Sequence, residues 1–162
     1  MPDDLPDGYY LDNFTFLLDF VSRQYCHLLS EQEKNFHSSF QALTLDSRKL
    51  FVRLTNRKGP YFRVDKLNYQ EVQSVEDEAL ALVAASFIVP TVPDLESAIR
   101  ICSKADLLNL DVFSGFPQST RKKDLASYLS SEQINPVQEL AIKVVELART
   151  EELMVFKLLF FG

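Results

Sequence analysis

The chain has 162 residues, of which 46% are hydrophobic, and this size suits one domain or two small ones with a packed core. Its two cysteines, Cys26 and Cys102, lie far apart in the sequence and away from both histidines, which excludes a disulfide framework and a zinc site and is typical of a reducing compartment. Four glycines exclude a glycine-rich phosphate loop as the organising element. The acidic N-terminus is unlike a signal peptide, and no apolar run reaches the ~18 residues of a membrane span, so we expect an intracellular protein.

A basic segment interrupts this acidic chain. Residues 44–66 contain seven Lys or Arg and two Asp, a net charge of +5, whereas the whole chain carries −6. Such an excess indicates either an anionic partner or a solvated helix face, and the order of helix, Gly-Pro break and aromatic strand suits a surface that contacts phosphates. The candidate nucleic-acid contacts in this segment are Arg53, Arg57, Lys58, Arg63 and Lys66.

The N-terminal part of the chain predicts two helices. Apolar residues recur at helical spacing from Tyr9 to about Leu29 and predict one amphipathic helix. Ser30 and Glu33 form a capping box, which predicts that a second helix starts there and continues to about Leu43.

A third helix and a small β-wing are expected next. Thr44 or Asp46 can cap the helix, and Gly59-Pro60 ends it. Residues 61–64 alternate enough to form a short strand, and the β-prone residues 87–90, which follow a further helix, are expected to pair with that strand. Three helices and a small wing around one Phe/Leu core predict a winged-helix pattern, in a fold that is mostly α with a little β.

Pro90 and Pro93 punctuate the chain, and we place a domain boundary there. Beyond it, Asp94 and Ser103 are positioned to cap two short helices.

A second basic cluster, Arg121, Lys122 and Lys123, opens the next helix, which Ser119 or Thr120 can cap. Its cations and the backbone N–H groups of the helix start point to the same place, an arrangement that binds phosphate.

The C-terminal part predicts two more helices. Asn135-Pro136 is a strong helix start, and Val144 and Leu147 fall on the apolar face of the helix that it predicts. Residues 153–161 contain one polar side chain, Lys157, so we expect the last helix to be buried, either in the core of this domain or against a downstream domain.

Motifs for catalysis are absent from the sequence. His27 and His37 are expected on different helices and away from any cysteine, which favours structural or surface roles over ligation or a Cys–His nucleophile. The chain has no G-x-S-x-G, H-E-x-x-H or P-loop motif. It also lacks any Asp or Glu two residues before a Lys, the spacing that metal-dependent nucleases of the restriction-enzyme type need. The sequence therefore predicts no enzyme, cofactor or metal site in this chain alone.

Three segments resemble the Fanconi-associated nuclease family, whose catalytic domain is of the VRR-NUC type. The most specific is LFVRLTNRKGPYFRVDKLNY, at residues 50–69 within a resembling run over 9–72. The segment SKADLLNLDVFSGFPQSTRKKDLASYL, at residues 103–129, is similar to the family's SAP-type DNA-binding unit. The final LMVFKLLFFG, at residues 153–162, is similar to the start of its helical, TPR-like region.

The resemblance implies an N-terminal DNA-binding module, of the bacterial type, from a structure-specific DNA repair nuclease. Members act as 5′-flap endonucleases and 5′ exonucleases in interstrand crosslink repair, with Mg²⁺ or Mn²⁺ in a catalytic domain that we expect beyond these residues. Double-stranded or flap DNA is then the partner, the nuclease domain acts in cis, and a bacterial protein would lie in the cytoplasm or nucleoid. The alternative is a helical protein-interaction module that binds no nucleic acid.

The resemblance also suggests a division into four segments. These are an N-terminal helical pair at 1–43, a winged-helix-like part at 44–92, a SAP-like unit at 93–131 and the beginning of a TPR-like region at 132–162.

Overall fold

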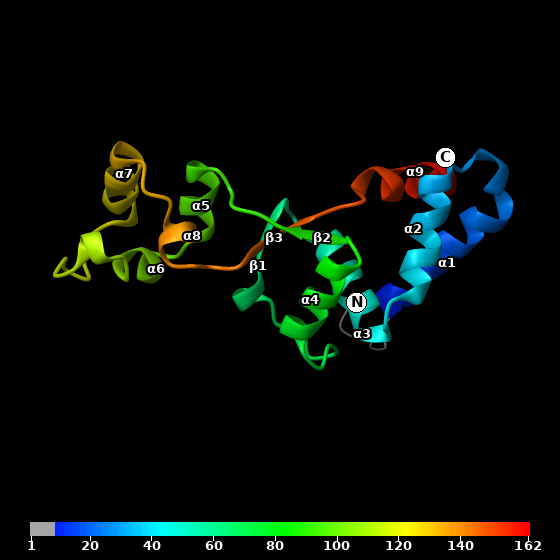
Figure 1. Ribbon diagram of the computed structural model, residues 1–162, viewed down its shortest axis with the longest axis horizontal. Helices are drawn as coiled ribbons and strands as arrows, with labels where there is room; N and C mark the ends of the chain where they lie inside the picture. The colour runs from blue at the N-terminus through cyan, green and yellow to red at the C-terminus, as the bar shows by residue number, and fades with distance from the viewer. Residues whose placement is uncertain (1–8) are drawn as a thin grey trace. The chain divides into compact units, whose positions relative to one another are not determined.

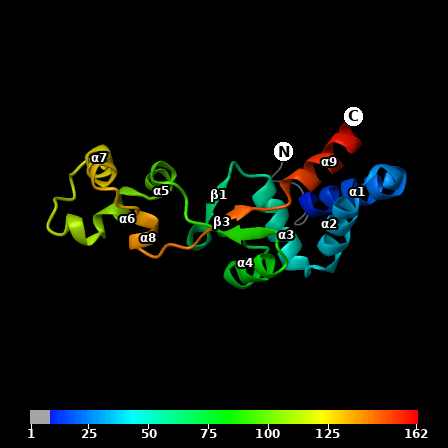
Figure 2. The same ribbon diagram turned by 45° about the horizontal axis from the view of Figure 1, so that its top comes forward.

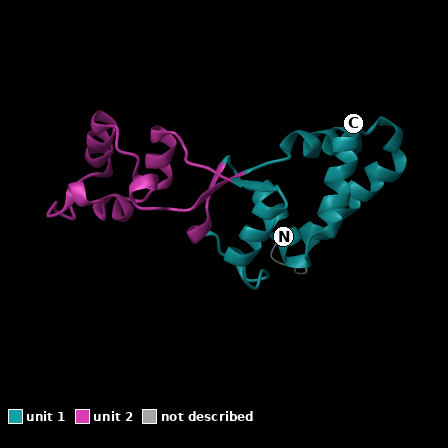
Figure 3. Ribbon diagram, viewed as in Figure 1, with its two compact units in different colours: residues 1–60, 67–89, 147–162 teal, residues 61–66, 90–146 magenta. Residues whose placement is uncertain are grey.

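The computed structural model describes residues 9–162, so the acidic N-terminal segment lies outside the described residues. It groups the chain into two compact units (Figure 3). Among the described residues, unit 1 contains residues 9–60, 67–89 and 147–162. Unit 2 contains residues 61–66 and 90–146. This differs from the four segments suggested by the sequence, which stay a prediction.

Unit 1 is a group of helices around an aromatic core. Helix α1 packs against α2, α3 and α9, and α9 also packs against α2 (Figure 1). Helix α4 packs beside α3, as Figure 2 shows. The helices of this unit are α1 (Tyr9–Gln24), α2 (Glu31–Ala42), α3 (Leu45–Thr55), α4 (Val75–Ala84) and α9 (Thr150–Phe161).

Side-chain caps fix the starts of three of these helices. The Ser30–Glu33 capping box is present at α2, as predicted. Thr44 accepts the first-turn N–H of α3, and Ser74 does the same for α4. The first helix is shorter than predicted: α1 ends at Gln24, and a 3₁₀ turn at Cys26–Leu28 covers the rest.

Phenylalanine fills the core of unit 1. Phe51 lies at the centre, with its ring centroid 4.9 Å from that of Phe87 and 6.2 Å from that of Phe40 in tilted or edge-on arrangements. Such offset pairs add to the free energy of apolar burial. The rings that join these contacts are Phe14, Phe36, Phe40, Phe51, Phe87 and Phe156.

Unit 2 is a set of short helices around a separate, smaller core. Ala98, Leu107, Leu125 and Leu129 are almost fully buried in it, beside Cys102. Asp94 and the Ser103–Asp106 capping box start α5 and α6, as predicted. The helices are α5 (Leu95–Ile101), α6 (Lys104–Leu108), a 3₁₀ turn (Asp111–Phe113), α7 (Lys122–Glu132) and α8 (Pro136–Glu139).

Three short strands, β1 (Tyr61–Arg63), β2 (Ile88–Pro90) and β3 (Val144–Leu147), form a sheet in the order β1-β3-β2. Strand β1 is antiparallel to β3, with Phe62 opposite Val145. The fold is therefore mostly α with a small sheet, as predicted. The predicted pairing of residues 87–90 with the first strand is wrong, because β3 lies between them.

Strand β3 also replaces part of a predicted helix. Asn135-Pro136 starts α8 as expected, but the helix ends at Glu139. Ala141 then adopts a positive φ of 52°, a left-handed conformation that interrupts the helix. Val144 and Leu147 fit a helical face by spacing, but both lie in β3, where the β-branched Val144 pairs with Arg63 of β1, far away in the sequence.

The last helix is buried along one side only. Leu153 and Phe156 lie in the core of unit 1, whereas Met154, Leu158 and Phe161 are exposed. In the described part of the chain, no helix is long and apolar enough to cross a membrane.

Candidate nucleic-acid interface

Arg53 is held in unit 1 by two tyrosines and a carboxylate. Its Nη2 and Nε lie 2.6 and 2.8 Å from Oε2 of Glu71, and the Tyr10 hydroxyl donates to the same oxygen at 2.7 Å. The guanidinium carbon lies 4.2 Å from the centre of the Tyr10 ring and 5.5 Å from that of Tyr69. Arg53 thus ties the start of α1 to the segment after residue 66.

The pKa values in this cluster follow from shared burial and pairing. Burial and the neighbouring Glu71 carboxylate raise the pKa of Tyr10 far above its usual value. Burial alone would raise the pKa of Glu71, but hydrogen bonds from Tyr10 and Arg53 lower it overall. Glu71 is therefore a charged partner that compensates Arg53, whose side chain remains 41% exposed.

Two further cations stand just beyond the end of α3. Arg57 is exposed, and its Nη1 donates to the Tyr69 hydroxyl at 3.2 Å. Lys58 follows and is exposed. Tyr69 thus contacts both Arg53 and Arg57, and this end of unit 1 presents positive charge to solvent.

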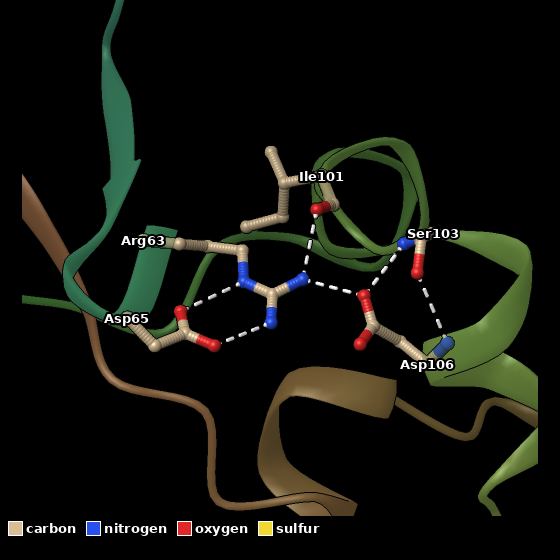
Figure 4. Close-up of polar contacts among 5 residues, drawn as sticks. All are labelled: Arg63, Asp65, Ile101, Ser103 and Asp106. Atoms are coloured by element: carbon tan, nitrogen blue, oxygen red, sulfur yellow. Dashed lines mark hydrogen bonds and ion pairs between the residues drawn. The ribbon is translucent and has the colours of Figure 1, made fainter. Parts of the chain in front are cut away.

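Arg63 has a different environment, shown in Figure 4. It is 8% exposed, and all three guanidinium nitrogens are used. Nη2 and Nε donate to the two carboxylate oxygens of Asp65, at 2.7 and 3.1 Å, in a bidentate pair. Nη1 donates to Asp106 Oδ2 at 2.6 Å and to the Ile101 carbonyl at 3.3 Å.

This Arg63 clamp joins a helix cap to a strand. The same Asp106 carboxylate oxygen accepts the Ser103 backbone N–H at 2.7 Å, so the capping box of α6 and the guanidinium share it (Figure 4). Burial alone would raise the pKa of Asp106, but the hydrogen bonds from Arg63 and Ser103 lower it to about 2. The hydrogen bond from Arg63 also lowers the pKa of Asp65. The predicted role of Arg63 as a DNA contact stays a prediction, and its burial argues against it.

The remaining predicted cations of unit 2 are more accessible. Lys66 is exposed just after β1. Arg121 is the residue before α7, Lys122 and Lys123 form its first turn, and all but the half-buried Lys122 are exposed. Neither Ser119 nor Thr120 caps this helix, since Arg121 occupies the cap position and makes no side-chain cap.

The structure divides the eight predicted site residues between the two units. Arg53, Arg57 and Lys58 belong to unit 1, and the other five belong to unit 2. Sequence reasoning missed Tyr10, Tyr69 and Glu71 as partners of the arginines. The aromatic and acidic residues of segment 67–73 were a usable signal, because they follow the basic segment directly.

Within residues 9–162, the structure brings together no group of three or more His, Cys, Asp or Glu side chains that could hold a metal ion. His37 instead has both ring nitrogens in contacts of 2.9 Å, with Ser22 Oγ and Asp19 Oδ1. Both partners come from α1, so the histidine joins α2 to α1.

Fold and charge together define a mostly helical module with a small sheet, which presents cations at the end of α3 and at the start of α7. Residues 8–89 match the family model described as "FAN1, HTH domain", about half of the chain. The chain belongs to this family.

Curated relatives of the chain are Fanconi-associated nuclease 1 homologs. The chain is 37% identical over 106 residues to a Fanconi-associated nuclease 1 homolog of Oryza sativa, covering 65% of this chain and 10% of that protein. It is 32% identical over 106 residues to the homolog of Pseudomonas aeruginosa, covering 65% of this chain and 18% of that protein. The chain thus spans less than a fifth of the length of these relatives.

Solved structures of paFAN1 share the fold. One, bound to DNA with a two-nucleotide 5′ flap and a gap, matches 95% of this chain and 30% of that chain with a TM-score of 0.78 and 28% identity. A second, bound to DNA with a one-nucleotide 5′ flap and a gap, matches with a TM-score of 0.76 and 27% identity.

Proposed function

We propose that this chain is the DNA-binding module of a structure-specific DNA repair nuclease and that it grips duplex DNA through phosphate contacts. The observation that carries the proposal is the match of 95% of the chain to a FAN1 protein bound to flap DNA. The exposed cations of both units support it, because they stand out against a chain charge of −6.

The mechanism is charge neutralisation. Each Lys or Arg that contacts a phosphate releases condensed counterions from the duplex, which favours binding without reading the base sequence. Arg57, Lys58, Lys66, Arg121 and Lys123 suit this role by their exposure, together with half-buried Lys122. Arg53 and Arg63 act mainly by holding their surroundings, since both are paired with carboxylates.

Within a full-length family member, we propose that the module serves 5′-flap endonuclease and 5′ exonuclease chemistry in interstrand crosslink repair. A nuclease domain acting in cis would supply the Mg²⁺ or Mn²⁺ and the cleavage. In this proposal the described residues contribute affinity and placement on the DNA.

Charge reversal at the start of α7 tests DNA binding. The variant Arg121→Glu/Lys122→Glu/Lys123→Glu should weaken duplex binding at least ~100-fold at low salt, because it removes three positive charges and adds three negative ones. The fold should survive, because the α7 N-cap makes no side-chain hydrogen bond and the side chains of Arg121 and Lys123 are exposed. Fluorescence anisotropy with a labelled duplex measures the affinity, and circular dichroism checks the fold.

The matched control is Lys104→Glu, a single reversal at the first residue of α6 in the same unit. We expect a smaller loss for this variant. Unchanged DNA affinity in the triple variant would favour the protein-interaction alternative, for which the exposed stripe Met154, Leu158 and Phe161 is the available surface.

A further inference from the structure

Unit 1 contains a groove that the phosphate contacts do not use. Its volume is about 520 Å³, within the range of about 300–1,000 Å³ of small-molecule sites. Helix α1 lines one side, the end of α3 another and the last turns of α9 a third.

Aromatic rings dominate the wall of this groove. Phe16 of α1 is 56% exposed, and Phe161 of α9 is 74% exposed. Phe160 lies between them, with its ring centroid 6.1 Å from that of Phe16 and 5.0 Å from that of Phe161, each at a nearly perpendicular angle. These rings hold one another in place and leave aromatic surface open to a flat ligand.

Polar side chains at the rim distinguish the groove from a plain apolar contact surface. Asn13, Asn56 and Lys157 all line it. Among the described residues, neither side-chain amide has a hydrogen-bond partner, and the Lys157 ammonium has no ion pair. Each asparagine amide offers both a hydrogen-bond donor and an acceptor. The groove therefore combines aromatic ring faces, two amides and one cation.

We propose that this groove receives an unpaired nucleobase of the bound DNA, an inference that rests on the proposed function. Base–aromatic stacking on Phe16 and Phe161 would hold the base, the asparagine amides would pair with its edge, and Lys157 would face its phosphate. A base in an intact duplex has its faces stacked and its pairing edge used, so the groove selects a single-stranded extension. Asn56 directly precedes Arg57 and Lys58, so the groove adjoins the cations that we assign to the backbone.

The test compares two DNAs with the full chain. One is a blunt duplex, and the other is the same duplex with a short 5′ single-stranded extension. Phe16→Ala should weaken binding of the extended DNA about fivefold or more, the low end of the loss expected for one stacked base, and should change blunt-duplex binding less than about twofold. Asn13→Ala/Asn56→Ala should act in the same direction. Leu80→Ala, at a side chain that is 61% exposed on α4, is the matched control and should change neither affinity.

Photocrosslinking locates the base independently of affinity. An extension carrying 5-iodo-deoxyuridine should form an adduct with Phe16, Phe160 or Phe161, identified by peptide mass spectrometry. Equal losses on both DNAs, or adducts confined to other residues, would overturn the proposal. Self-association of the wild-type chain in sedimentation, abolished by Phe16→Ala, would also overturn it, because a second copy would then occupy the groove. Failure of the wild-type chain to bind the blunt duplex would instead count against the proposed function.

Discussion

Arg53 and Arg63 belong to one basic segment, but the structure gives them opposite surroundings. Arg53 lies on unit 1 between two tyrosine rings, and its side chain is 41% exposed. Arg63 lies in unit 2 with a side chain that is 7% exposed and is paired with two carboxylates. Charge density along a sequence therefore identifies a basic region without telling which cations face solvent and which hold the fold together.

The partners explain the difference. Solvent reaches the 41% exposed Arg53 side chain and screens its pair with Glu71. Glu71 is itself 12% exposed, but it keeps the hydrogen bond from the Tyr10 hydroxyl when Arg53 is removed. The Arg63 side chain is 7% exposed and pairs with the half-exposed Asp65 and with Asp106, which is 18% exposed. Removing the guanidinium therefore leaves Asp106 largely out of water and without an ion pair. The comparison predicts large stability effects at Arg63 and small ones at Arg53.

Removing the Arg63 clamp should have the largest effect. Arg63→Ala is expected to lower the free energy of unfolding by about 3 kcal/mol, because breaking one side of a buried ion pair leaves a buried charge uncompensated. Urea unfolding followed by circular dichroism measures it. The control is Lys66→Ala, at an exposed residue three positions further along the chain. It should lower the free energy of unfolding by less than about 0.5 kcal/mol. A loss equal to that of the control would mean that the clamp contributes nothing to unit 2.

Acid should weaken the same clamp. The pKa of Asp106 is about 2 in the folded protein, below the value of about 3.9 for an unfolded Asp. Because the folded pKa is lowered, the charged Asp106 stabilises the fold fully above about pH 5, and this contribution, on the order of 2 to 3 kcal/mol, is lost as the pH falls towards 2. Asp106→Asn should remove this part of the pH dependence in unfolding measurements from pH 5 to 2. An unchanged acid profile in the variant would contradict the assignment.

Arg53→Ala should lower the free energy of unfolding by about 1 kcal/mol, because solvent screens the 41% exposed Arg53 side chain and its contacts with the tyrosine rings are partly open to solvent. Glu71 also keeps its hydrogen bond from the Tyr10 hydroxyl in this variant. Thermal or urea unfolding checks this value against Lys58→Ala, an exposed cation nearby that should be neutral. A loss as large as that of Arg63→Ala would remove the distinction between the two arginines.

Local chemistry made much of the fold predictable. The capping box at Ser30 and Glu33, and the helix starts at Ser74, Asp94 and Ser103, lie within a few residues of the groups that they cap. The basic residues of the candidate interface could likewise be found, because net charge is a property of the sequence alone.

Contacts between residues far apart in the sequence could not be predicted. Strand β3 forms because Val145 lies opposite Phe62, and no local pattern separates that strand from a helix with the same apolar spacing. The burial of Arg63 depends on Asp106, which is 43 residues away. The tyrosines around Arg53 come from segments on either side of α3, so only the folded chain brings them together.

The salt dependence of duplex binding tests the central claim most directly. If the exposed cations of the two units contact about five or six phosphates, the logarithm of the binding constant plotted against the logarithm of salt concentration should have a slope of roughly −5. Arg63→Ala, at a pH and temperature where it is folded, should leave that slope unchanged, whereas Lys58→Ala should make it shallower by about 0.9. A wild-type slope near zero would contradict phosphate neutralisation as the basis of binding.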